Sequence, residues 1–206
     1  MKRYALNLLS LATFLLFPFY VHSQCWPRSE KLMPQKSPNT TEAFGQSIDF
    51  KDDLAVIGAP SSDTARTSSG VVYVMKFDGS AWNKIASLVP SDHRLYHGFG
   101  RVVKILGNYI LVGDPNRQIE GVAKGAIYVF EKPVGGWRDM VETTIITSSD
   151  PRCLSLGADV DVHENTILAG APYSLNDDGK NVGAAYVFEL QGNAFWRLHD
   201  SQPRTL

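Results

Sequence analysis

Residues 99–115 read FGRVVKILGNYILVGDP, and the same pattern appears as FGQSIDFKDDLAVIGAP at 44–60 and as LGADVDVHENTILAGAP at 156–172. A further glycine follows each stretch, at Gly70, Gly125 and Gly183, and opens an aromatic and β-branched run such as GVVYVMKF. The copies start 55 and 57 residues apart, counted from Gly45 to Gly100 and from Gly100 to Gly157. This period is too long for ankyrin, tetratricopeptide or leucine-rich units and suits a four-stranded propeller blade.

Each copy predicts four short strands. In the first copy, residues 46–50 lead to a polar turn at 51–53, and residues 54–57 are then apolar without alternation. Such a run is typical of a strand buried on both faces, and 109–113 and 166–170 repeat it. A proline then ends the strand because it cannot donate to the ladder. The third strand begins at the further glycine, and the fourth is expected near Trp82, Trp137 and Trp196. The mature chain shows no helical period, so the predicted fold class is all-β.

The motif resembles the FG-GAP repeat of integrin-alpha-type β-propellers. The resemblance covers about residues 26–203 and implies three antiparallel blades of about 56 residues. Asp114 replaces the alanine of the second copy and Leu156 the phenylalanine of the third, without disturbing the glycine and proline positions. We expect the repeated glycines to mark bends where adjacent blades approach closely. The structural motif residues are Phe44, Gly45, Gly58, Pro60, Phe99, Gly100, Gly113, Pro115, Gly157, Gly170 and Pro172.

Three blades cannot close a ring, because closed propellers use about four to eight. The predicted organisation is a signal peptide at 1–23, a fourth-strand segment at 24–43, and blades at 44–98, 99–155 and 156–206. The N-terminal segment repeats the Trp, Leu and Pro spacing of the first blade's fourth strand. Three accounts stay open: a partial propeller that lacks C-terminal blades, self-association of two three-blade halves, or an open stack with exposed edges. Self-association would leave the N-terminal strand unpaired.

The N-terminus favours secretion. Met1-Lys2-Arg3 precedes an apolar run at 8–20, and Val21 and Ser23 suit cleavage before Gln24. A membrane anchor and lipidation of Cys25 are the alternatives. A disulfide between Cys25 and Cys153 stays open, because sequence separation does not give spatial distance. We therefore expect a secreted or cell-surface protein.

No cofactor is expected. Relatives often hold calcium on an Asp-x-Asn-x-Asp-Gly loop between the first two strands, but here about four residues are left for each turn, and calcium needs six to eight oxygens. Residues 176–179, Asn-Asp-Asp-Gly, are the remaining metal candidate, and a solvated turn is the simpler reading of them. The formal net charge of −1 offers no basic stripe for nucleic acid.

The resemblance implies that the loops between strands two and three, together with the interblade loops, lie at one face. These loops differ between copies while the strands do not, which favours recognition of a protein or glycan there, in adhesion or as a spacer in a larger surface protein. An enzyme is not predicted: Asp92, His93 and His97 share a loop, but no nucleophile motif or metal-binding pair accompanies them. The candidate ligand-binding residues are Arg66, Tyr96, His97, Arg117 and Tyr173.

Overall fold

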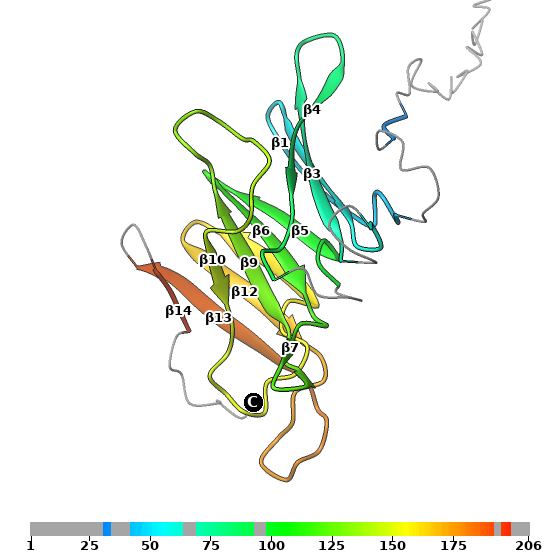
Figure 1. Ribbon diagram of the computed structural model, residues 1–206. Coiled ribbons are helices and arrows are strands. Elements are labelled where there is room, and N and C mark those ends of the chain that lie inside the picture. The colour runs from blue at the N-terminus through cyan, green and yellow to red at the C-terminus, as the bar shows by residue number, and fades with distance from the viewer. Residues whose placement is uncertain (1–30, 34–41, 64–68, 93–97, 192–194, 199–206) are drawn as a thin grey trace, which may run out of the picture. The chain divides into compact units, whose positions relative to one another are not determined.

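The computed structural model describes residues 31–33, 42–63, 69–92, 98–191 and 195–198 (Figure 1). The chain divides into two compact units, residues 1–31 and 32–206, and every described strand lies in the second. No described residue belongs to a helix, which confirms the all-β prediction. It follows that the described part holds no helix of the length and apolar character needed to cross a membrane.

The strands form three four-stranded antiparallel sheets in chain order, which confirms the predicted blades (Figure 1). Blade 1 contains β1 (Ser47–Lys51), β2 (Leu54–Ala59), β3 (Val71–Phe77) and β4 (Trp82–Leu88). Blade 2 contains β5 (Val102–Leu106), β6 (Tyr109–Asp114), β9 (Ala126–Glu131) and β10 (Thr144–Ile146), and a small hairpin of β7 (Gln118–Ile119) and β8 (Val122–Ala123) rises between β6 and β9. Blade 3 contains β11 (Asp159–His163), β12 (Thr166–Ala171), β13 (Ala184–Gln191) and β14 (Phe195–Leu198).

The first hairpin of every blade has a two-residue tip. Lys51 pairs with Leu54 across the tip of blade 1, and blades 2 and 3 pair the equivalent residues around 107–108 and 164–165. Asp52 lies at φ 56°, in the left-handed region that so tight a reversal demands. The predicted short hairpins are confirmed, and a tip of two residues cannot surround a cation that needs six oxygens.

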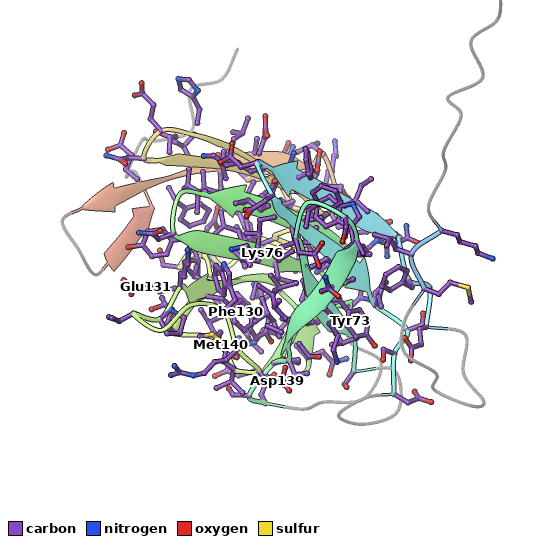
Figure 2. The ribbon with its side chains drawn as sticks, turned by 90° about the horizontal axis from the view of Figure 1, so that it is seen from above. Tyr73, Lys76, Phe130, Glu131, Asp139 and Met140 are labelled. Carbon is purple, nitrogen blue, oxygen red and sulfur yellow. The ribbon has the colours of Figure 1, made fainter. Side chains whose placement is uncertain are left out.

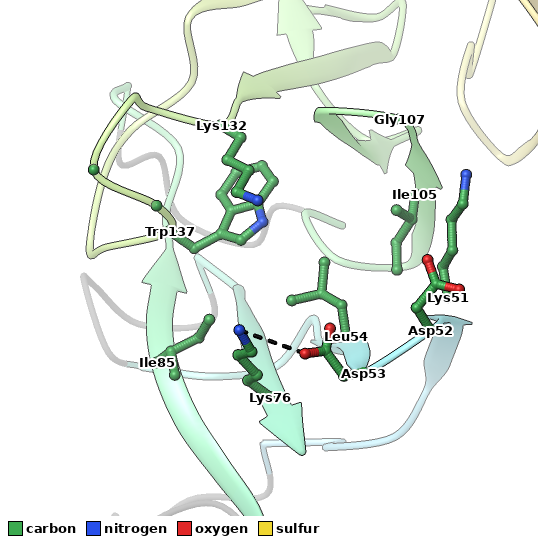
Figure 3. A pocket seen from close by; sticks show the side chains of 12 residues that line it. Lys51, Asp52, Asp53, Leu54, Lys76, Ile85, Ile105, Gly107, Lys132 and Trp137 are labelled. Carbon is green, nitrogen blue, oxygen red and sulfur yellow. Dashed lines mark ion pairs between the residues drawn. The ribbon is translucent and has the colours of Figure 1, made fainter. Parts of the chain in front are cut away.

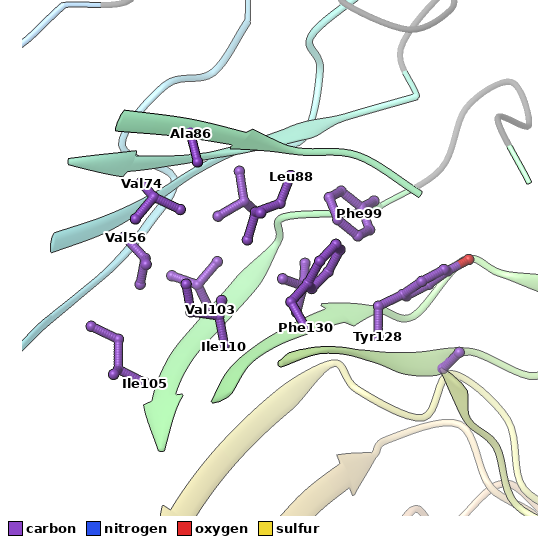
Figure 4. Close-up of a cluster of buried hydrophobic side chains, with 13 residues drawn as sticks. Val56, Val74, Ala86, Leu88, Phe99, Val103, Ile105, Ile110, Tyr128 and Phe130 are labelled. Atoms are coloured by element: carbon purple, nitrogen blue, oxygen red, sulfur yellow. The ribbon is translucent and has the colours of Figure 1, made fainter. Parts of the chain in front are cut away.

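Two hydrophobic clusters lie between neighbouring blades, because each sheet is apolar on both faces. The cluster between blades 1 and 2 joins Val56 and Leu88 to Phe99, Tyr128 and Phe130, all fully buried (Figure 4). The ring of Phe99 lies edge-on to Tyr128, with centroids 5.2 Å apart. Burying each of these large side chains is worth about 1.5–3 kcal/mol. The cluster between blades 2 and 3 includes Leu111, Ile127, Val129, Leu156, Ile167 and Phe188.

Blade 3 departs from the prediction that its second strand is buried on both faces. The side chains of β12 alternate instead: Ile167 and Ala169 are buried, whereas Leu168 is exposed. The equivalent strand of blade 2, β6, is buried at Ile110 and at Leu111 alike. The reason is that blade 3 packs on blade 2 through one face only, and no described blade covers the other.

The outer strand of blade 2 begins later than predicted, at Thr144 rather than near Trp137. The intervening chain pairs with blade 1: Val89 N–H donates to Met140 C=O at 3.2 Å, and Met140 N–H donates to Ser87 C=O at 3.2 Å. Met140 also packs on the cluster between blades 1 and 2, near Phe130 (Figure 2). Hydrogen bonds from Met140 to β4 of blade 1 therefore take the place of the pairing expected in the first part of the blade 2 strand.

The predicted N-terminal fourth strand falls mostly outside the described residues. Within it, residues 31–33 and 42–43 are described and belong to no strand. Leu32 nevertheless packs against the outer face of blade 1, which is formed by Ile57, Val71 and Tyr73.

Candidate functional site

The connections that follow the proline of each copy share one construction. In blade 1, Gly70 N–H donates to Ser62 C=O at 3.1 Å, and the equivalent bonds in blades 2 and 3 run from Gly125 to Arg117 at 3.0 Å and from Gly183 to Ser174 at 3.0 Å. Each loop is thus closed at its base by the same glycine. Beyond that base the loops differ, because blade 2 folds the β7–β8 hairpin and blade 3 a turn around 175–181.

A tyrosine pairs with a carboxylate beneath each loop, and it is buried in blades 1 and 2 and partly buried in blade 3. Tyr73 donates to Glu42 at 3.1 Å, and the equivalent tyrosines of β9 and β13 donate to Asp92 and Asp150, each at 3.2 Å. Every acceptor lies in the segment that leads into the Phe-Gly or Leu-Gly of its own copy. These pairs were not predicted from the sequence, although the tyrosine that recurs at one place in all three third strands was a usable signal.

Arg117 completes this pair in blade 2 and is not a freely presented side chain. Its Nε donates to Asp92 Oδ2 at 3.3 Å and to the Tyr128 hydroxyl at 3.1 Å, and its guanidinium lies 5.9 Å from the Tyr128 ring centroid. Only 16% of the Arg117 side chain is exposed. Burial raises the pKa of Tyr128, and the carboxylates of Asp114 and Asp92 raise it further. The geometry therefore suits Arg117 to holding Asp92 against the Tyr128 hydroxyl of β9.

Arg152 joins the equivalent pair of blade 3 to the loop above it. Its Nε lies 3.2 Å from Asp150 Oδ1, and its Nη1 pairs with Asp177. Burial alone would raise the pKa of Asp150, but hydrogen bonds from the Arg152 backbone and guanidinium outweigh it, so the pKa is lowered. Asp177 was part of the metal candidate at 176–179. That turn is closed internally, because Asn176 accepts bonds from both Gly179 and Lys180.

The other predicted ligand-binding residues are placed as follows. Tyr173 is exposed on the β12–β13 loop and belongs to a different blade from Arg117. Arg66, Tyr96 and His97 lie outside the described residues, so their predicted roles stay predictions. Across the residues that the structure describes, no group of three or more His, Cys, Asp or Glu side chains could hold a metal ion. Cys153 is a buried free thiol whose pKa is raised, chiefly by burial, and Cys25 lies outside the described residues.

A hollow of about 400 Å³ lies at the opposite end, where the hairpin tips are (Figure 3). Its floor is apolar, with Leu54, Ile105 and Trp137, and Lys76 pairs with Asp53 at 3.4 Å on its rim. Lys51 and Lys132 also line it. The hollow lies between blades 1 and 2, and the sequence analysis did not predict it. The hollow is therefore a second surface that could bind a ligand, and a binding test of the loop end must include variants at the hollow.

The comparison with known families follows the observed blades. The FG-GAP repeat family matches residues 26–75 and 82–130, which begin at Trp26 and Trp82, and the second match ends at Phe130 within β9. This chain is an FG-GAP repeat protein. The third copy, from Leu156 onward, lies beyond the family matches but forms the same four-stranded sheet.

Comparisons with individual proteins add little on function. A search of curated proteins found no match to the FG-GAP chain. Among solved structures it is similar to the periplasmic gluconolactonase PpgL of Pseudomonas aeruginosa, with 14% identity and a TM-score of 0.39. The likeness covers 79% of this chain and 59% of that one, so the FG-GAP chain spans less than two thirds of PpgL. At this level the likeness carries no inference about activity.

Proposed function

We propose that this FG-GAP protein is a secreted or surface-exposed binding module that recognises a protein or glycan, in adhesion, through the loop end of its blades. The loop end comprises residues 61–69, 116–124 and 173–182 and the interblade loops at 92–97 and 149–152. It is a proposal about recognition and not about turnover. Asp92, the carboxylate of the weak enzyme hypothesis, is engaged by Arg117 and Tyr128, which suits a structural role better than that of a general base.

The observation that supports this proposal best is the contrast between constant bases and variable loops. The equivalent glycine closes every loop at its base, and the equivalent tyrosine bonds to a carboxylate before each Phe-Gly or Leu-Gly. Above that base the chain folds the β7–β8 hairpin in blade 2 and a turn around 175–181 in blade 3. A rigid scaffold that presents variable loops is the usual arrangement of a recognition surface. Tyr173 was predicted to bind a ligand, and its aromatic side chain is exposed at the loop end. Tyrosine is enriched at interface anchors.

The test uses loop replacement with a matched control. Each loop at 61–69, 116–124 and 173–182 is replaced by a Gly/Ser segment of equal length, and binding is measured on a glycan array and a panel of immobilised extracellular-matrix and cell-surface proteins. The control replaces the hairpin tips at 52–53 and 107–108 with Asn-Gly. We expect binding to fall with at least one loop replacement and to survive the control.

Two outcomes would contradict the proposal. Binding that survives all three loop replacements would favour a structural spacer, and binding lost only with the tip replacements would move the site to the hollow around Trp137. Thermal melting of every variant separates lost recognition from lost folding. Secretion is checked separately by N-terminal sequencing of the exported protein, which should begin at Gln24.

A further inference from the structure

The two interblade contacts repeat one detailed arrangement. A Cβ placed on Gly58 of blade 1 would lie 2.0 Å from the carbonyl oxygen of Gly100, and one placed on Gly70 would lie 2.2 Å from that of Phe99. Blade 2 receives blade 3 in the same way: Gly113 faces the Gly157 carbonyl at 2.3 Å, and Gly125 faces that of Leu156 at 2.2 Å. The paired glycines of one blade thus form a cradle for the Phe-Gly or Leu-Gly segment of the next blade.

Blade 3 carries the same cradle, and no residue that the structure describes is seated in it. At Gly170 the nearest atoms to an added Cβ belong to Asp159 of its own sheet, at 3.7 Å, and at Gly183 they belong to Pro172. Gly183 keeps φ +74°, the value found at Gly125, so the cradle is already formed. The apolar side chains around it are exposed: Leu168 is 49% exposed, whereas its counterpart Leu111 in blade 2 is 1% exposed.

Blade 1 presents the complementary half of this contact. Its own Phe-Gly segment ends in Gly45, at φ +87°, and a Cβ there would meet no atom within 4 Å. Behind it, Ile48 and Phe50 of β1 are 72% and 62% exposed, whereas their counterparts in β5 are buried at 2% and 7%. Among the described residues, Leu32 covers the outer face of blade 1 at Ile57, Val71 and Tyr73 but leaves Ile48 and Phe50 exposed. Within that part of the chain, the stack therefore has a largely uncovered Phe-Gly edge at one end and an unfilled glycine cradle at the other.

We propose that a second copy of this chain docks head-to-tail, with Phe44-Gly45 of each copy seated on Gly170 and Gly183 of the other. A contact between two different surfaces is heterologous and closes into a ring only when the rotation permits. Two copies of three blades give a ring of six, within the range of about four to eight in which propellers close. The inference rests on the blade contacts alone and is independent of what the loop end binds.

A second copy is the occupant that the chain itself specifies. The two glycines of the blade 3 cradle lie 13 residues apart, against 12 in each occupied cradle, and Gly183 keeps the φ of Gly125. The segments seated in the occupied cradles are Phe-Gly and Leu-Gly, and blade 1 carries a further Phe-Gly at Phe44-Gly45. The apolar groups left open at Leu168 and Ile48 are the ones that the equivalent internal contacts bury. A further FG-GAP blade is the competing occupant, and the test below separates the two.

The first experiment measures the mass of the purified protein by size-exclusion chromatography with light scattering between 1 and 100 µM. We expect twice the 22.7 kDa of one chain, less any leader removed from each copy. Leu168→Arg and Ile48→Arg should each weaken association roughly 100-fold or more, because each puts an unpaired charge into a desolvated contact. Val134→Arg is the control, since Val134 is fully exposed in a turn remote from both edges and should not change the mass.

The second experiment tests the head-to-tail direction. Leu168→Arg retains an intact Phe-Gly edge and Ile48→Arg an intact cradle, so an equimolar mixture should recover one contact and form a two-chain species that neither variant forms alone. Circular dichroism melting verifies that both variants are folded.

Four results would overturn the proposal. The first is a monomeric protein throughout the concentration range, and the second is a dimer that neither substitution weakens. The third is a dimer weakened by Leu168→Arg alone, which would indicate a symmetric tail-to-tail contact. The fourth is a series of larger oligomers, which would indicate that the contact does not close into a ring.

Discussion

Replacing Gly58 with alanine tests whether glycine spacing sets the distance between blades. The added Cβ would lie 2.0 Å from the Gly100 carbonyl oxygen and 2.4 Å from Ser47 Oγ. Neither neighbour is the free end of a flexible chain: Gly100 is backbone, and Ser47 Oγ donates to that same carbonyl at 2.8 Å. Blade 2 must therefore move away by roughly 1 Å before an ordinary contact distance is restored.

The cost follows from two terms. Overpacking a well-filled contact costs about 1–3 kcal/mol, and loss of the Ser47 hydrogen bond adds about 0.5–1.5 kcal/mol. Restricting the unfolded chain with alanine offsets about 0.4–1 kcal/mol of this. The midpoints of these ranges give an expected net loss of about 2 kcal/mol in the free energy of unfolding. At about 2–4 °C per kcal/mol for a chain of this size, the melting temperature should fall by roughly 4–8 °C.

Gly170→Ala is the matched control, because Gly170 occupies the same place in blade 3 with only ordinary contacts around it. Both variants are made in the Ile48→Arg background, so that self-association does not contribute, and are unfolded in urea. We expect Gly170→Ala to change stability by less than about 0.5–1 kcal/mol, in either direction. Equal losses at Gly58 and Gly170 would refute the reasoning, since the effect would then come from the strand and not from the neighbouring blade.

Three further predictions concern the interior of the blades. Tyr128→Phe should cost about 1–3 kcal/mol in urea unfolding, because it removes the hydroxyl that donates to the partly buried Asp92 carboxylate; a double-mutant cycle with Asp92→Asn should show coupling, and strict additivity would contradict the pair. The pKa of Asp150 is lowered on folding, so its contribution is present above the ordinary carboxyl pKa and is lost as pH falls through the folded value; Asp150→Asn should therefore flatten the loss of stability between pH 5 and 2, and a curve parallel to wild type would count against this assignment. The buried Cys153 thiol, whose pKa is raised, should react with a thiol reagent only on unfolding in a Cys25→Ser background, and rapid native labelling would show that the site opens.

The strand ends and tight turns of each blade could be predicted from the sequence. Proline ends the second strand of each blade because it lacks a donor, and polar pairs such as Asp52-Asp53 tolerate the tight reversal of the first hairpin. The outer strand of blade 2 could not be placed in this way. Its start depends on a competition between pairing within its own sheet and pairing of Met140 with β4 of blade 1, and two registers of similar local propensity are separated only by tertiary contacts.

The candidate site was harder to predict for the same reason. Tyr128 and Asp92 are 36 residues apart, as are Tyr186 and Asp150. No local pattern links a strand residue to a loop residue at that distance. Arg117 was predicted to bind a ligand from the loop after Pro115, and its burial against Tyr128 became visible only once both elements were placed.

The sequence by itself determined the repeating unit, because backbone chemistry is local: a glycine permits a left-handed turn and a proline removes a donor wherever they stand. It could not determine which faces of the three similar sheets are covered, because that depends on what is stacked against them. Leu111 and Leu168 occupy the same place in successive copies, yet one is buried between blades and the other faces outward. Only the tertiary arrangement of the blades made that difference, since burial belongs to a pair of surfaces and not to a residue.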